Sequence, residues 1–171
     1  MWENTMTDRA DASNEYDLFI SYAHADNEGR YDGWVTALTE AIQREHAEFV
    51  PASGALRIFF DTAEIRNMDD WEARILLGLR QSKLLVAVLS PAYFASDYCR
   101  QEWAGYRDLE TQRGLLGEGI AGAYVVEHPE FSAANQDHQD EWLADLKRRQ
   151  YTDLQEWWPQ GREALEQVEV R

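Results

Sequence analysis

Short apolar runs alternate along this chain with segments in which hydrophobic residues recur at helical spacing. Residues 18–20 form the first apolar run, and Trp34, Leu38 and Ile42 then follow four apart, as on one face of a helix. The same unit repeats to the end of the chain. Strands are predicted over 18–20, 56–60, 84–89, 123–126 and 151–154, and helices over about 34–42, 71–79, 97–109, 140–149 and 162–170.

The order of these elements predicts the fold class. The uninterrupted apolar run 84–89 is typical of a parallel strand that is covered on both faces. Alternating strands and helices therefore predict a doubly wound α/β sandwich with right-handed crossovers. Within the glycine-punctuated stretch before the fourth strand, residues 114–119 are interpreted as a flexible loop. The polar residues 1–15 are interpreted as a flexible leader to one domain over 16–171.

The composition narrows the classes of function. At 171 residues with 44% hydrophobic content, the chain is long enough for one domain with a full core. A formal net charge of -16 repels phosphate backbones and anionic lipids, so neither nucleic acid nor membrane is expected as a partner. The lone Cys99, the lack of a secretory pattern and the lack of an apolar run of about 20 residues predict a cytoplasmic protein.

Glu102 is the first candidate for chemistry. It follows the buried strand 84–89 by one short segment, and open α/β sheets bind their ligands outside the carboxyl ends of the strands. The commoner fate of a helical glutamate is an exposed ion pair with a neighbouring arginine. Its place beside the strand end favours the catalytic interpretation.

Three segments of the sequence resemble the motifs of TIR domains. They are Tyr16-Asp17-Leu18-Phe19-Ile20-Ser21-Tyr22, Arg57-Ile58-Phe59-Phe60-Asp61, and Leu89-Ser90-Pro91 with Cys99-Arg100-Gln101-Glu102-Trp103. Their order and spacing agree with the alternation of strands and helices. The resemblance covers residues 16 to about 170 and implies a flavodoxin-like α/β fold. Its sheet would hold five parallel strands in the order 2-1-3-4-5, with helices on both faces.

The resemblance also implies an activity. TIR domains divide into adaptors that only assemble and enzymes that cleave NAD+, and the enzymes carry a glutamate in the helix after the third strand, where Glu102 stands. Trp71 matches the family's aromatic residue that helps to hold the nicotinamide end of the substrate. Residues 65–70 lack the glycine that this loop often contains, and Ala23 and His24 stand where the family often has basic residues.

The strand ends supply the remaining candidates for substrate binding. In the implied strand order, ligands bind beside the ends of strands 1 and 3, which brings Ser21, Tyr22 and Ser90 to one place. His24 is a candidate for contact with the substrate phosphates. The alternatives are that the two serines satisfy backbone groups, that His24 is an ordinary loop residue, and that Trp71 belongs to the core stripe of its helix.

Cleavage of the bond between nicotinamide and ribose suits a single carboxylate. Nicotinamide in NAD+ is already cationic and leaves as a neutral molecule, so the remaining task is to stabilise an oxocarbenium-like sugar. Glu102 is predicted to do this electrostatically, by bonding the ribose hydroxyls, or by orienting a water. Attack by adenine instead of water would give a cyclic product. NAD+ is the expected substrate, no cofactor is expected, and the scattered histidines (His24, His46, His128, His138) predict no metal site.

The resemblance finally implies partners. Enzymatic TIR domains commonly self-associate, because a neighbouring subunit's loop completes the site. A fused or separate sensor domain and an effector role in bacterial antiphage defence are further implications. The alternative is a non-enzymatic module that binds other TIR domains through residues 62–70 and its helical faces.

Overall fold

One parallel sheet organises the molecule. The computed structural model describes residues 15–60, 70–115, 117–124, 144–146 and 148–167. The strands are β1 (Tyr16–Ser21), β2 (Ile58–Phe60), β3 (Ser82–Leu89), β4 (Ile120–Tyr124) and β5 (Tyr151–Asp153). All of their pairings are parallel, and they lie in the order β2-β1-β3-β4-β5. The predicted α/β fold and its strand order are confirmed.

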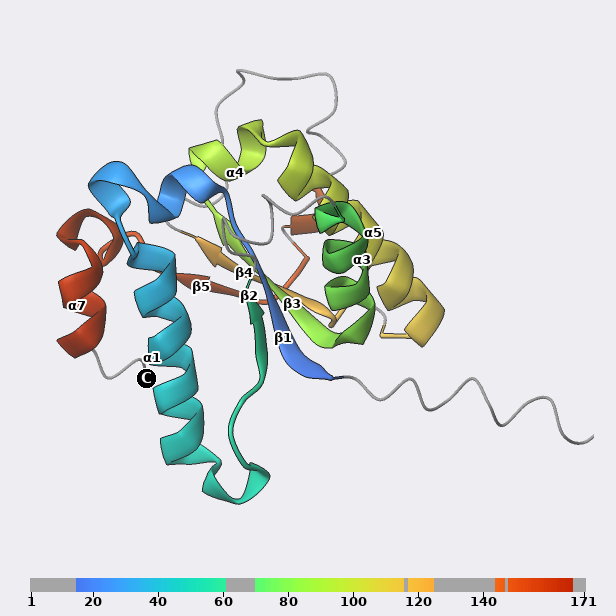
Figure 1. Cartoon of the computed structure of the whole chain (residues 1–171), viewed down its shortest axis with the longest axis horizontal. Coiled ribbons are helices and arrows are strands. Elements are labelled where there is room, and N and C mark those ends of the chain that lie inside the picture. Colours follow the sequence, from blue (N-terminus) through green and yellow to red (C-terminus); the bar gives the residue numbers. More distant parts are fainter. Residues whose placement is uncertain (1–14, 61–69, 116, 125–143, 147, 168–171) are drawn as a thin grey trace, which may run out of the picture.

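Helices cover both faces of this sheet. They are α1 (Trp34–Phe49), α3 (Trp71–Gln81), α4 (Pro91–Ala95), α5 (Asp97–Arg113) and α7 (Arg162–Gln167), with short 3-10 helices η1 (His24–Asn27), η2 (Gly29–Tyr31), η3 (Pro51–Ser53) and η4 (Trp158–Gln160). Figure 1 shows α1 and α7 on one side of the sheet and α3 and α5 on the other. The molecule is therefore a three-layer sandwich.

The core divides into two clusters because successive side chains of a strand point to opposite faces. On β1, Phe19 packs in the cluster that contains α3 and α5, whereas Ile20 packs in the cluster of α1 and α7. Both residues are almost completely buried. β1 and β3 are neighbours, and Ser21 pairs with Ala87 in their register. The carboxyl ends of these two strands consequently lie side by side.

The helix that carries Glu102 has well-defined ends. The Ser96 side chain caps the start of α5 by accepting a hydrogen bond from the Cys99 amide at 3.2 Å. Gly114, at a φ of 67°, adopts the left-handed conformation that ends the helix. A buried stripe runs between these ends at helical spacing. It consists of Cys99, Glu102, Trp103, Tyr106 and Glu110.

Two element predictions in the second half of the chain were wrong. The fourth strand begins at Ile120, three residues before the predicted start, because small residues there fit between the two helical layers and pair with β3. The predicted helix 140–149 does not reach its end, since the chain turns at residues 148 and 149. The described part of that prediction, 144–146, is helical. α4 was not predicted, and it begins at Pro91, a residue suited to the first turn of a helix.

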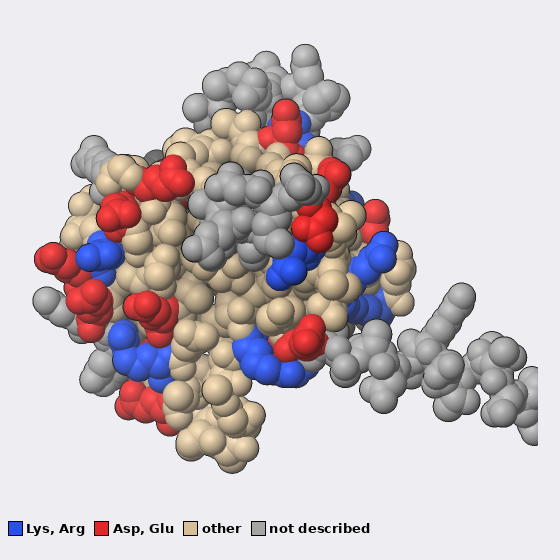
Figure 2. Space-filling view, viewed as in Figure 1, with Lys and Arg blue, Asp and Glu red and all other residues tan. Residues whose placement is uncertain are grey.

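Charged side chains of both signs share the surface. On the face in Figure 2, Lys and Arg lie among Asp and Glu instead of gathering in one basic patch. Asp17, for example, accepts a hydrogen bond from Lys83 at 2.8 Å and lies 3.5 Å from Arg57 Nε. No helix among the described residues is long and apolar enough to cross a membrane. The predicted leader, apart from Glu15, lies outside the described residues.

Candidate functional site

Glu102 is buried beside the end of β1. Only 3% of this residue is exposed, because it lies on the inward stripe of α5. Ser21 Oγ donates a short hydrogen bond of 2.5 Å to Glu102 Oε2, across 81 positions of the sequence. A carboxylate that accepts a hydrogen bond is held in one orientation, with its charge partly balanced. Glu102 is therefore a positioned group and not an exposed surface charge.

Tyr93 extends this contact on the far side of Ser21. Its phenolic oxygen lies 2.9 Å from Ser21 Oγ, and both residues are completely buried. A serine hydroxyl has one proton, and that of Ser21 goes to Glu102, so Tyr93 is the donor to Ser21. Burial raises the pKa of Tyr93 well above its usual value, and the nearby Cys99 and Glu102 add to this effect. Tyr93 thus keeps the proton that it donates.

A small cavity of about 70 Å³ opens beside Glu102. The rings of Trp71 and Tyr98 line it, with their centroids 5.2 Å apart. Its other lining residues are Glu72, Ile75, Leu76, Leu79 and Gln101. Sites that enclose a drug-sized ligand measure about 300–1,000 Å³, so these described residues surround only a fraction of a dinucleotide. The cavity offers aromatic surface next to a carboxylate.

Trp71 lies both against the core and at the cavity of Glu102. It is the first residue of α3, it is half-buried, and it packs against the core cluster that contains Ile75 and Leu79. It also lines the cavity with Glu102. The prediction that Trp71 and Glu102 share one site agrees with this geometry, and the contact of Trp71 with a substrate stays a prediction.

Ser90 is completely buried, and its hydroxyl is used within the protein. It donates a hydrogen bond to Asp26 Oδ2 and accepts one from the Tyr93 amide at 3.0 Å, which caps α4. Ser21 is likewise engaged, with Glu102 and Tyr93. The predicted alternative, that these serines satisfy backbone groups, is met by Ser90, which binds the Tyr93 amide, and not by the side-chain contacts of Ser21. Their predicted contact with a substrate stays a prediction.

Asp26 is a buried carboxylate that sequence reasoning missed. It lies in η1, only 4% of it is exposed, and it receives the hydrogen bond of Ser90. Burial raises the pKa of Asp26 from 3.8 to about 6, against the lowering effect of the Ser90 bond. In the sequence Asp26 sits in a polar segment, His24 to Arg30, where nothing distinguishes it from exposed neighbours.

Tyr22 and His24 lie apart from this cavity. Tyr22 is buried, and its ring stacks on Phe60 at 5.0 Å and on His24 at 5.3 Å. It belongs to the core cluster of α1 and α7, whereas Trp103, the neighbour of Glu102, belongs to the opposite cluster. Of the six predicted site residues, Glu102 and Trp71 line this cavity, Ser21 bonds to Glu102, and Ser90 is connected to Ser21 through Tyr93. Contacts of Tyr22 and His24 with a substrate stay predictions.

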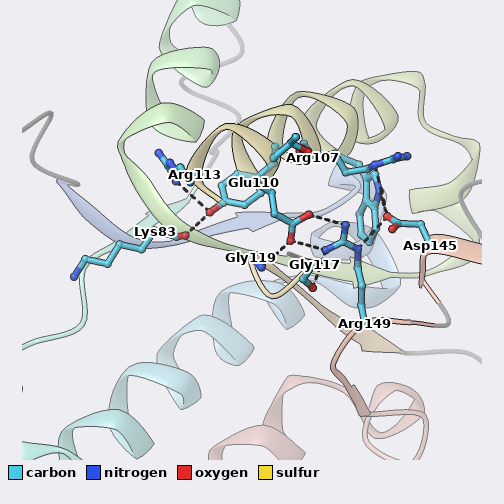
Figure 3. A network of polar contacts seen from close by, with 11 residues as sticks. Lys83, Arg107, Glu110, Arg113, Gly117, Gly119, Asp145 and Arg149 are labelled. Carbon is cyan, nitrogen blue, oxygen red and sulfur yellow. Dashed lines mark hydrogen bonds and ion pairs between the residues drawn. The ribbon is translucent and has the colours of Figure 1, made fainter. Parts of the chain in front are cut away.

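A second polar network supports the other end of α5 (Figure 3). The guanidinium of Arg149 binds both carboxylate oxygens of Glu110, at 2.7 and 2.8 Å. Burial by itself would raise the pKa of Glu110, but the bonds from Arg149 and the Gly119 amide hold it below its usual value. Asp145 accepts hydrogen bonds from Arg149 at 3.0 Å and from the indole of Trp103 at 3.2 Å. The network therefore holds the residue next to Glu102.

No group of three potential metal ligands forms among the residues that the structure describes. Cys99 is buried, and neither it nor His24 nor His46 joins such a group. His128 and His138 lie outside the described residues.

The sequence is similar to a known family of domains and to several named proteins. The profile of a family described as TIR domain matches residues 18–168. The chain is 33% identical over 108 residues to the NAD(+) hydrolase TcpA of Theionarchaea archaeon (strain DG-70-1), a match that covers 62% of this chain and 29% of that protein. It is also 33% identical over 105 residues to the probable 2' cyclic ADP-D-ribose synthase BdTIR of Brachypodium distachyon, covering 60% of this chain and 46% of BdTIR.

Two further comparisons extend the range of relatives. The probable 2' cyclic ADP-D-ribose synthase TcpB of Brucella melitensis biotype 1 is 31% identical over 100 residues, which are 58% of this chain and 35% of TcpB. The chain thus matches less than half of the length of each of these relatives. Among solved structures, the TIR domains of the activated Roq1 resistosome superpose with a TM-score of 0.55 at 18% identity, over 89% of this chain and 96% of that one. This likeness concerns the fold.

Proposed function

Because this chain belongs to the TIR domain family, we propose that it cleaves NAD+ at the bond between nicotinamide and ribose, with Glu102 as the essential carboxylate. The observation that carries the proposal is the burial of Glu102 beside an aromatic cavity, with Ser21 fixing its carboxylate at 2.5 Å. The names of the relatives, an NAD(+) hydrolase and probable cyclic ADP-D-ribose synthases, support the same class of reaction.

The proposed cleavage requires an ionised carboxylate and no general acid to protonate the leaving group. The pyridinium of NAD+ leaves as neutral nicotinamide, and positive charge develops on the ribose. Glu102 stabilises that charge, and a carboxylate that is already oriented and shielded from water does so without reorganising during the reaction. Water then attacks the sugar, or a group of the same molecule does so, either the adenine or the 2'-hydroxyl that the names of the cyclase relatives denote. The relatives include a named hydrolase and a named cyclase, so both a hydrolysed and a cyclic product agree with their names. The proposed scheme uses no cofactor and no metal.

Self-association belongs to the proposal. The described residues enclose a cavity of only about 70 Å³, a small part of what a dinucleotide requires, and a second copy is proposed to supply further walls. A solved relative in fold forms part of a resistosome. Clustering by a fused or separate sensor domain would raise the effective concentration of these domains and so start the reaction.

The test is mass spectrometry of NAD+ incubated with the domain, first dilute and then clustered on beads. Loss of NAD+ with release of nicotinamide is expected in the clustered sample and not in Glu102→Gln, which keeps the shape of the side chain and removes its charge. The mass of the second product separates hydrolysis from cyclisation. Intact NAD+ in the clustered sample, with a folded protein, would contradict an enzyme that works by itself.

A scaffold without enzymatic activity is the second candidate. Leu76 and Leu77 on α3 are 49% and 54% exposed, and Leu76 also borders the cavity of Glu102. Adjacent exposed leucines are suited to contact with another protein. A domain that associates with copies of itself but leaves NAD+ intact would favour this function. Cross-linking of the clustered protein, with Leu77→Lys as the disrupting variant, measures that association.

The proposed setting is the cytoplasm of a bacterium under phage attack, where loss of NAD+ would stop phage growth together with the host. The defence role rests on the resemblance of this chain to TIR domains. A plaque assay of cells that carry the full-length gene, with and without Glu102→Gln, tests it. Equal plaque numbers in the two strains would count against the defence role.

A further inference from the structure

The ends of β1 and β3 carry two buried carboxylates in a crossed arrangement. Ser21 ends β1 and bonds to Glu102, which lies on α5, in the connection after β3. Ser90 follows β3 and bonds to Asp26, which lies on the helix after β1. The serine at the end of β1 therefore binds the acid that follows β3, and the serine after β3 binds the acid that follows β1. Both acids are at most 4% exposed.

Tyr93 joins the two halves into one chain of contacts, through its backbone amide on one side and its phenolic hydroxyl on the other. Its amide donates to Ser90 Oγ at 3.0 Å, and its phenolic oxygen lies 2.9 Å from Ser21 Oγ. The chain therefore runs from Asp26 through Ser90, Tyr93 and Ser21 to Glu102. Every member is almost completely buried, where hydrogen bonds are stronger than in water. Tyr93 couples the two ends mechanically, because its amide and its hydroxyl belong to one rigid side chain and backbone unit.

We propose that Asp26 is a positioning residue for Glu102, acting through Ser90, Tyr93 and Ser21. Ser90 donates its hydroxyl hydrogen bond to Asp26, and this turns a lone pair of Ser90 Oγ toward the Tyr93 amide. The amide bond fixes the first turn of α4 and with it the direction of the Tyr93 ring. The ring in turn sets the distance of its hydroxyl to Ser21, the donor to Glu102.

Burial of Asp26 supports a role beyond packing. Its pKa of about 6 means that the ionised group is held at a cost to folding. Groups with such perturbed pKa values concentrate at functional sites. The effect of these contacts on catalysis rests on the proposed function. Their effect on the position of Glu102 does not.

The first test observes Glu102 directly and does not require that the domain cleave NAD+. Protein labelled with 13C at the glutamate side-chain carboxyls is studied by NMR at pH 8, and Glu102→Gln identifies the Glu102 resonance by removing it. Asp26→Leu, which accepts no hydrogen bond, is expected to move that resonance. Ser96→Ala is the matched control, because it removes the cap of α5 and no member of the chain, and it is expected to leave the resonance in place.

The second test is kinetic and uses the clustered protein. Asp26→Leu is expected to lower kcat about 10- to 100-fold with KM within about twofold, as for a group that is misplaced without loss of substrate binding. Asp26→Asn is expected to recover most of the lost rate, since its amide oxygen accepts the hydrogen of Ser90. Thermal unfolding shows that each variant is folded. If Asp26→Leu does not fold, Ser90→Ala breaks the same chain from the other side.

Two results would overturn the inference. One is an unmoved Glu102 resonance in folded Asp26→Leu or Ser90→Ala protein, whatever its activity. The other is an equal loss of kcat in Asp26→Asn and Asp26→Leu, because the charge of Asp26 and not its acceptor would then matter. A moved resonance in a protein that leaves NAD+ intact would support the chain and contradict only the proposed function.

Discussion

Ser21 and Glu102 are 81 positions apart in sequence, and their hydrogen bond of 2.5 Å holds a carboxylate beside the cavity. Ser21→Ala is expected to lower kcat about 10-fold, because Glu102 loses a donor that orients it. Ser82→Ala is the matched control, since Ser82 is a buried serine at the opposite end of the sheet that donates to the Gly78 carbonyl. Initial rates of nicotinamide release measure both. An equal loss of rate in Ser21→Ala and Ser82→Ala would show that the effect of Ser21 comes from its burial and not from its bond to Glu102.

Asp26 should make the stability of the fold depend on pH. Its pKa is about 6 in the folded chain against 3.8 as a free side chain, so the folded state binds more protons between these values. The free energy of unfolding therefore falls as pH rises from about 4 to about 6. Asp26→Asn is expected to stabilise the protein by on the order of 2 kcal/mol at pH 8 and by little at pH 4. Urea unfolding of both proteins at the two pH values tests this, and a gain that does not change with pH would contradict it.

At the scale of elements, the pair Glu110 and Arg149 ties α5 to the segment that precedes β5 (Figure 3). Both side chains are at most 6% exposed, so removal of one leaves the other charge buried. Arg149→Met is expected to lower the free energy of unfolding by about 3–5 kcal/mol, and Arg149→Met with Glu110→Leu by much less. Chemical denaturation measures both. A double variant as unstable as the single one would show that the pair itself is stabilising.

The same scale shows which elements a sequence pattern predicts. α3 and α5 follow clear stripes of apolar residues, and both were predicted near their observed starts. β4 was placed too late, because its residues Ile120 to Gly122 are mostly small and look like a loop. Their pairing with β3 between two helical layers makes them a strand. Tertiary pairing thus overrides a weak local preference.

At the scale of the whole molecule, a net charge of -16 opposes the self-association that the proposed function requires. Salt screens this repulsion, with a Debye length of about 30 Å at 0.01 M and 8 Å at 0.15 M. Association is therefore expected to increase between these concentrations, together with the rate of NAD+ cleavage per molecule. Sedimentation velocity at both salt concentrations measures it. Weaker association at the higher concentration would indicate an interface made of complementary charges.

The sequence by itself determined the class of fold, the five parallel strands with their order by resemblance, and Glu102 as the candidate carboxylate. These follow from periodicity and short motifs, which are local. Only the tertiary structure decided that Ser21 donates to Glu102 and that Asp26 is buried against Ser90. The physical reason is that each of these contacts joins segments at least 64 positions apart, whose approach depends on the register of β1 and β3 and on no local pattern.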